Sequence, residues 1–89
     1  MRKQDPKAIT AQVGAKIAEL RRANDLTQER FAELLGVSVQ WVSRAEGGEN
    51  LTIHTMVRLA NCLKVPVAEL FVPPTTPPPK AGRGRPRKK

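Results

Sequence analysis

Short helical segments, each bounded by residues that start or stop a helix, run through most of this chain. Apolar residues recur at helical spacing after Thr27, Ser38 and Thr52, and a hydroxyl side chain at such a place can accept a hydrogen bond from the first turn of a helix. Gly36 and the glycine pair at 47–48 follow the first two segments. Glycine readily takes the positive φ found just after a helix. The pattern predicts several short helices packed on one another.

The first helix is expected over residues 10–23, with Thr10 as its N-cap. Asp5-Pro6 offers an earlier start, because proline suits the first position of a helix. Gly14 lies inside this helix, where it permits close packing of a neighbouring helix at some cost in propensity. Pro66 opens a last short turn that holds Val67, Leu70 and Phe71. Together the segments predict an all-α protein, a small five-helix bundle.

The two helices on either side of Gly36 are joined by a very short turn, which predicts a helix-turn-helix unit. The second of them spans residues 38–46. One of its faces, together with the turn before it, is apolar: Val37, Val42 and Ala45. The opposite face carries Ser38, Gln40, Trp41, Ser43 and Arg44, and has no acid before Glu46. A helix of this kind fits the major groove of DNA and can reach base edges there.

Apolar faces are also expected on the neighbouring helices: Phe31, Leu34 and Leu35 on one, and Ile53, Met56, Val57, Ala60 and Leu63 on the next. Cys62 falls within that second pattern and is expected to be a small core residue. Lys16, Arg22, His54 and Arg58 are expected at the surface. One histidine, one cysteine and no glycine-rich phosphate loop leave no credible catalytic pair. We therefore expect no enzymatic activity, no cofactor and no metal site.

Positive charge is concentrated at the end of the chain. The chain has 16 Lys and Arg against 8 Asp and Glu, and six of those cations lie in residues 73–89, which hold no acid. Residues 73–82 begin with a proline-rich run, which predicts an extended, semi-rigid linker. The tail that follows consists of Arg83, Gly84, Arg85, Pro86, Arg87, Lys88 and Lys89. Such an imbalance of charge indicates a polyanionic partner, usually nucleic acid.

The first four residues of that tail read Arg-Gly-Arg-Pro. Glycine has no side chain and proline fixes φ, so the segment is thin and extended. Arginines on such a segment suit the narrow, negative minor groove of A·T-rich DNA. The tail resembles the AT-hook of high-mobility-group A proteins, and the resemblance implies that residues 83–89 bind this groove. A solubilising tail and a sorting signal are the alternatives.

Residues 10–72 resemble the lambda-repressor-like domain of bacterial and phage regulators, the Cro/C1 or XRE family. The family's motif falls on residues 28–47, with its small residue at Ala32 and its turn glycine at Gly36. Its core positions are apolar here: Phe31, Leu35, Val37, Val42 and Ala45. The resemblance implies a transcription regulator that binds double-stranded DNA. It divides the chain into a flexible segment 1–9, a DNA-binding domain 10–72, a linker 73–82 and the tail 83–89.

The resemblance also implies roles for single residues. Val39, Gln40 and Arg44 match the family's base-reading positions, and glutamine suits adenine while arginine suits guanine. A second set is implied to hold phosphate or to support the reading helix: Gln28, Ser38, Trp41, Ser43, Arg21 and Glu46. Within it, Arg21 and Glu46 match a pair that bridges the first helix to the end of the third. Trp41 either covers sugar and phosphate or folds back onto the fourth helix.

Other interpretations stay open. The chain could be an architectural or nucleoid protein of low sequence preference, in which the tail dominates binding. It could also be a protein-interaction module of the antitoxin or anti-repressor type, using residues 65–72 and the proline-rich segment. A homodimer through Leu70, Phe71 and Val72 competes with a role of these residues in capping the core. No stretch is apolar enough to span a membrane, and a cytoplasmic, nucleoid-associated protein is expected.

Overall fold

The computed structural model describes residues 3–75, which form four α-helices and one 3-10 helix without any strand. In chain order they are α1 (Pro6–Ala23), α2 (Gln28–Leu35), α3 (Val39–Glu46), α4 (Ile53–Leu63) and η1 (Val67–Phe71). The all-α prediction is confirmed for this part of the chain. The fifth helix is a single short 3-10 helix, a form that is common in such brief terminal pieces. Of the expected linker only residues 73–75 are described, and the AT-hook-like tail lies outside the described residues.

Helix α1 begins at Pro6, earlier than the expected start at residue 10. Asp5 is the N-cap, and its Oδ1 accepts a hydrogen bond from the Lys7 N–H at 3.1 Å. Proline is preferred at the first helical position because its φ is already helical and its missing N–H is not needed there. The prediction that Thr10 caps this helix is wrong, since its hydroxyl donates to the Lys7 carbonyl from inside the helix. Residues 6–9, which were expected in a flexible segment 1–9, belong to this helix.

The three other α-helices start at the hydroxyl residues that the sequence predicted. Thr27, Ser38 and Thr52 each accept a hydrogen bond of 3.0–3.1 Å from the backbone N–H three residues further along. Gly36 ends α2 in the left-handed conformation, with φ 73°. The α2–α3 turn is therefore determined by local sequence, through a glycine stop followed at once by a serine cap.

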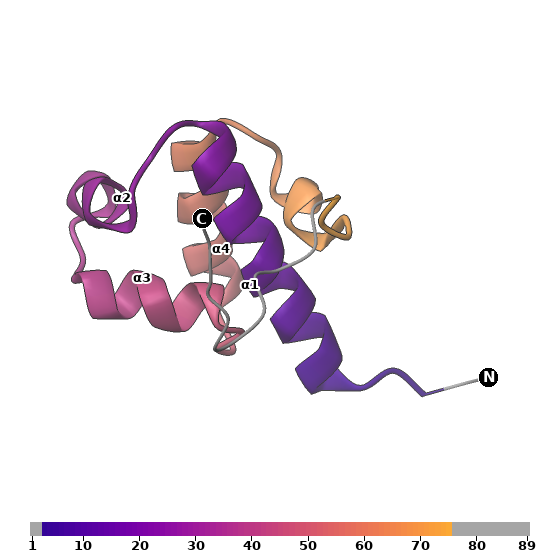
Figure 1. Ribbon diagram of the computed structural model, residues 1–89. Coiled ribbons are helices and arrows are strands. Elements are labelled where there is room, and N and C mark those ends of the chain that lie inside the picture. Colours follow the sequence, from indigo (N-terminus) through magenta and orange to yellow (C-terminus); the bar gives the residue numbers. More distant parts are fainter. Residues whose placement is uncertain (1–2, 76–89) are drawn as a thin grey trace, which may run out of the picture.

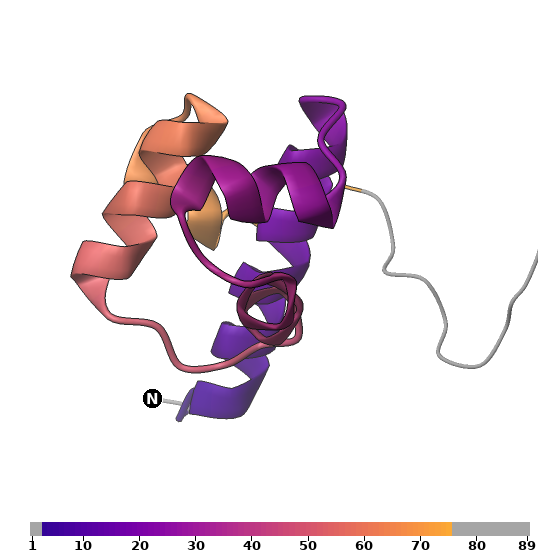
Figure 2. The ribbon, with the colours of Figure 1, turned by 90° about the vertical axis from the view of Figure 1, so that its left-hand side faces the viewer.

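Helix α1 crosses the middle of the molecule and contacts α3, α4 and η1 (Figure 1). Helix α2 is seen along its axis in Figure 1, where α3 lies across the view. In Figure 2, turned by 90°, α2 lies across the view and α3 is seen along its axis. The two helices therefore cross steeply, as expected of a helix-turn-helix unit.

A single core joins all five elements. Its largest fully buried side chains are Phe31, Ile17, Leu59, Leu63, Leu70 and Val42. Three residues expected in the core, Leu34, Ile53 and Val57, are exposed instead. On α4 the buried stripe runs through Met56, Leu59, Ala60 and Leu63, so it lies to one side of Ile53 and Val57. Cys62 is partly buried against this core, and burial raises the pKa of its thiol.

Lys16 is buried, with a relative exposure of 4%, so the prediction that it is a surface charge is wrong. Its Nζ lies 2.9 Å from the Glu19 carboxylate and 3.5 Å from that of Glu69. The hydrogen bond to Glu19 raises the pKa of Lys16 above its ordinary value of 10.5. Lys16 thus connects α1 to η1, because its buried charge is paired with one carboxylate from each helix.

The chain after η1 returns along α1. Gln12 donates to the Phe71 carbonyl at 3.1 Å, and Glu19 accepts hydrogen bonds from the backbone and hydroxyl of Thr75 at 2.9 and 2.6 Å. Leu70 is fully buried in the core. The prediction that Leu70 shares in a dimer seam is therefore wrong, because its side chain caps the core.

Candidate nucleic-acid interface

Helix α3 has one buried face and one exposed face. Val42 and Ala45 are buried against the bundle. The exposed residues of the helix and its cap are Ser38, Gln40, Ser43 and Arg44, and the partly buried ones are Val39, Trp41 and Glu46. The helix therefore offers hydrogen-bonding side chains to solvent, while its apolar stripe holds it to the rest of the domain.

Gln40 and Arg44 are four residues apart on α3, so they lie one above the other on the same face. Both are exposed. An amide and a guanidinium are the side chains that pair with adenine and with guanine in the major groove. Of the three expected base readers these two are exposed, whereas Val39 is partly buried and packs against the core.

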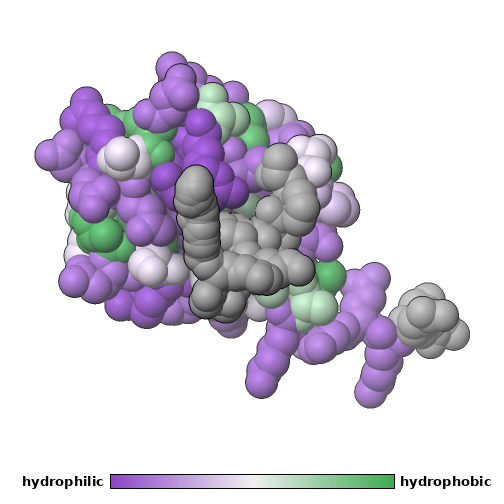
Figure 3. Space-filling model, viewed as in Figure 1, coloured by the Kyte–Doolittle hydropathy of each residue, from purple (hydrophilic) through white to green (hydrophobic). Residues whose placement is uncertain are grey.

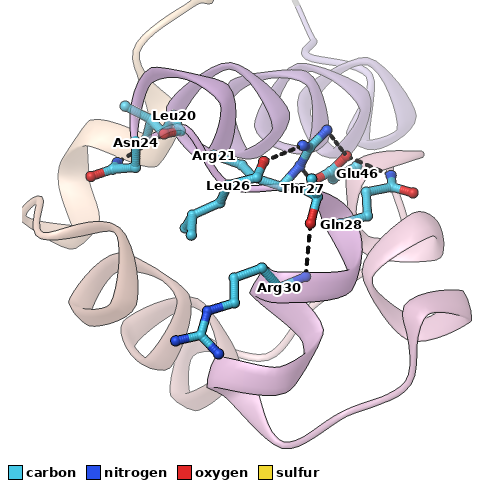
Figure 4. Close-up of polar contacts among 8 residues, drawn as sticks. All are labelled: Leu20, Arg21, Asn24, Leu26, Thr27, Gln28, Arg30 and Glu46. Carbon is cyan, nitrogen blue, oxygen red and sulfur yellow. Dashed lines mark hydrogen bonds and ion pairs between the residues drawn. The ribbon is translucent and has the colours of Figure 1, made fainter.

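The end of α3 is held by the carboxylate of Glu46 (Figure 4). Arg21 of α1 donates to it twice, from Nε to Oε2 at 2.6 Å and from Nη2 to Oε1 at 3.3 Å. Gln28, the first residue of α2, donates to the same Oε1 at 2.9 Å. The third arm of the Arg21 guanidinium donates to the Leu26 carbonyl at 2.7 Å. One carboxylate thus ties α3 to α1 and to the start of α2.

Gly14 brings the backbones of α1 and α3 close together. A Cβ at this position would lie 2.7 Å from the carbonyl oxygen of Glu46 and 2.8 Å from both the Ala45 oxygen and the Gly48 nitrogen. These are backbone atoms, so they cannot turn aside as a side chain would. The expectation that Gly14 permits close helix packing is confirmed, and the contact is with the end of α3.

Several residues that were expected to contact phosphate make hydrogen bonds or packing contacts within the domain. The Gln28 amide is bonded to Glu46, and the Ser38 Oγ accepts from the Trp41 N–H at 3.0 Å. The Ser38 hydroxyl keeps its own proton to donate to another group. Trp41 is partly buried against the core. Ser43, by contrast, is exposed to solvent.

Arg58 and Glu49 make contacts near this site that the sequence did not predict. Arg58 of α4 was expected to be an ordinary surface charge, yet its Nη2 donates to the Leu35 carbonyl at 2.6 Å and so supports the end of α2. Glu49, in the turn after α3, forms an ion pair with Arg44 at 3.2 Å. A turn acid five residues after a helical arginine follows no helical spacing rule, so this contact could not be predicted from the sequence pattern.

The surface seen in Figure 3 is mostly hydrophilic, and its hydrophobic residues form small separate patches. Among residues 3–75, no group of three or more His, Cys, Asp and Glu side chains could hold a metal ion. The helices of this same stretch include none that is both long and apolar enough to cross a membrane.

A steeply crossed helix pair, whose second helix is anchored at its end and offers a polar face, defines the helix-turn-helix class of DNA-binding transcription regulators. The chain belongs to this class. The family described as helix-turn-helix domain matches residues 12–70. Within it, the chain is an XRE-type, lambda-repressor-like domain.

Similar proteins agree with this assignment. Over 62 residues the chain is 42% identical to the uncharacterized HTH-type transcriptional regulator y4dJ of Sinorhizobium fredii, a match that spans 68% of this chain and 80% of that protein. The restriction-modification controller protein C.AhdI from Aeromonas hydrophila is 34% identical, with a TM-score of 0.67 over 72% of this chain and 98% of its own. A hypothetical transcription factor, NHTF, from Neisseria shares the fold at 23% identity, with a TM-score of 0.69 over 83% and 86% of the two chains.

Proposed function

We propose that the chain is a sequence-specific transcription regulator that reads the major groove of double-stranded DNA with α3. One observation carries the proposal: Gln40 and Arg44 are exposed on one face of a helix whose opposite face is buried. A helix held in this way can enter the groove without giving up any core contact. The domain is small, and its reading helix is fixed to two neighbouring helices through Glu46.

Each side chain has a role in this proposal. Gln40 pairs with adenine and Arg44 with guanine, while the accessible part of Val39 meets a thymine methyl group. Arg21 and Glu46 hold the reading helix in its orientation. The residues around α3 that approach the DNA backbone are Gln28, Ser38, Trp41 and Ser43. Such contacts fix the register of the protein on the duplex and carry no sequence information themselves.

The C-terminal tail extends the contact in this proposal. Residues 83–89 enter a neighbouring A·T-rich minor groove, and the linker joins them to the bundle. Tethering makes this second contact effectively intramolecular, so overall affinity rises without a larger interface on the domain. Phe71 and Val72, which are exposed, are the residues left for a homodimer seam. We place the protein on the nucleoid of a bacterial cell, or at a phage operator.

Selection of bound duplexes from a random-sequence pool tests the function. A regulator of this type should yield one defined motif, with an adenine and a guanine whose preference depends on Gln40 and Arg44. An architectural protein should yield no motif, or A·T richness alone. A second result would also count against the proposal. If substitution of Gln40 or Arg44 by alanine weakened binding equally on all duplexes, these residues would not read bases.

A further inference from the structure

Arg44 is connected to Glu49 in two ways at the end of α3. The Glu49 N–H donates to the Arg44 carbonyl at 3.2 Å. The Glu49 carboxylate also forms an ion pair with the Arg44 side chain, and the closest atoms are Oε1 and Nε at 3.2 Å. The acid is therefore attached at its backbone to the residue whose guanidinium it approaches.

The turn that carries Glu49 is well supported. Gly47 N–H donates to the carbonyls of Ser43 and Arg44, and Gly48 has a φ of 100° that other residues rarely adopt. A Cβ on Gly48 would lie 3.0 Å from Cα of Ala11, so the turn packs directly on α1. The fold therefore holds the backbone of Glu49, from which the carboxylate reaches Arg44.

Stability does not account for this ion pair. The Arg44 and Glu49 side chains are 58% and 49% exposed, and pairs so open to solvent contribute little to folding. An acid next to a DNA-reading face also opposes binding to phosphate. A carboxylate in this position is better explained by what it does to the guanidinium.

The guanidinium of arginine carries one N–H on Nε and two on each terminal nitrogen. The closest contact of the ion pair is at Nε, and the two terminal nitrogens form a planar fork at the far end of the group. That fork matches the O6 and N7 acceptors of guanine, and it also matches the oxygens of a phosphate. A guanidinium without a partner at Nε can turn toward either of them.

Resting on the proposed function, we propose that Glu49 is a positioning residue that restricts Arg44 to guanine. Its carboxylate holds the Nε edge, presents the terminal fork for base reading and disfavours phosphate contacts by this arginine. Glu49 therefore lowers affinity for DNA in general and raises discrimination at one base pair. The residue acts through Arg44 and does not itself contact the base.

The test uses the full chain and a duplex chosen from a random-sequence pool by the wild-type protein. Arg44→Ala first identifies the base pair at which preference is lost. The dissociation constants of wild type, Glu49→Gln and Glu33→Gln are then measured for the four duplexes that differ at that pair. We expect Glu49→Gln to reduce the preference for guanine at least about threefold and to bind the other three duplexes more tightly, because part of the discrimination by the arginine fork is lost.

Glu33→Gln is the matched control. It removes the same charge from an equally simple exposed ion pair, Arg30–Glu33 at 2.8 Å, in which the two side chains are 59% and 69% exposed. It should leave the preference at the Arg44 base pair unchanged. Thermal unfolding midpoints of both variants should match the wild type, which separates positioning from a loss of fold.

The outcomes distinguish this inference from the function on which it rests. If Arg44→Ala abolishes guanine preference while Glu49→Gln keeps the wild-type ratio, the positioning role is wrong and base reading by Arg44 stands. If Arg44→Ala changes preference at no base pair, the reading role fails and the role of Glu49 fails with it.

Discussion

Arg21 of α1 and Glu46 of α3 form a bidentate ion pair with distances of 2.6 and 3.3 Å. The two side chains are only 11% and 8% exposed. Removing two charges from water is costly, and good geometry with additional hydrogen bonds must offset that cost. Here those bonds come from Gln28 and the Leu26 carbonyl. The pair therefore sets the position of α3 more than it adds to stability.

Glu46→Ala should destabilise the domain by about 3–5 kcal/mol, because the Arg21 guanidinium remains buried without its partner. The measurement is urea unfolding followed by circular dichroism. Arg30→Ala breaks the exposed Arg30–Glu33 pair and should cost less than about 1 kcal/mol. A loss of the same small size for both variants would show that Glu46 is no more important than a surface acid.

Gly14→Ala should also destabilise the domain, by about 1–3 kcal/mol, because the new methyl group meets the backbone at the end of α3. Helix propensity alone predicts the opposite sign, a gain of about 1 kcal/mol. The sign of the change in unfolding free energy therefore decides between close packing and local propensity. Gly36→Ala is a useful comparison, since its Cβ would meet nothing within 4 Å and the cost there is backbone strain alone.

Local signals allowed much of this fold to be predicted from sequence. Thr27, Ser38 and Thr52 cap helices as expected, and Gly36 forms the turn, because each acts through the backbone of its immediate neighbours. The start of α1 was misplaced because Thr10 and the Asp5-Pro6 pair are both valid start signals. Periodicity alone could not choose between them.

Contacts between distant segments were the part that the sequence did not reveal. From its place in the sequence, Lys16 is expected at the surface. It is buried and paired because η1, far along the chain, places Glu69 beside it. Helical periodicity marked Leu34 and Val57 as core, yet the width of a buried stripe depends on how closely the neighbouring helices pack. The exposed face of α3 was predicted correctly except for Trp41, which is partly buried against the core. The approach of Glu49 to Arg44 depends on the path of the turn after Gly48.

Gln40→Ala should weaken binding to the selected duplex by about 1–3 kcal/mol and relax preference at a single base pair. The physical reason is the loss of the amide that pairs bidentately with adenine. Dissociation constants on the selected duplex and on duplexes altered at each position provide the measurement. Binding to an unrelated duplex should stay near the wild-type value, because no phosphate contact is removed. Equal weakening on both duplexes would place Gln40 outside base reading.

The ion pairs of Lys16 should make the stability of the fold depend on pH in the alkaline range. The pKa of Lys16 in the folded state is raised above 10.5 by Glu19 and Glu69. The ion pairs therefore stabilise the fold fully below that value, and this contribution is lost as pH rises through the folded pKa. Unfolding free energy measured against pH should fall in this alkaline range for the wild type. Lys16→Met should lack this part of the fall, while the exposed Lys7→Met should keep it.

The basic tail predicts a specific effect of salt on DNA binding. Deleting residues 80–89 removes six cations, and the slope of log affinity against log salt should fall by up to about five units if all of them meet the duplex. Arg83→Lys together with Arg85→Lys keeps the charge but removes the planar guanidinium groups. This double variant should keep the salt slope and lose preference for A·T-rich sequence beside the selected motif. An unchanged slope after the deletion would mean that the tail does not contact DNA. A double variant that kept the A·T preference would mean that the tail attracts DNA by charge alone, without reading the minor groove.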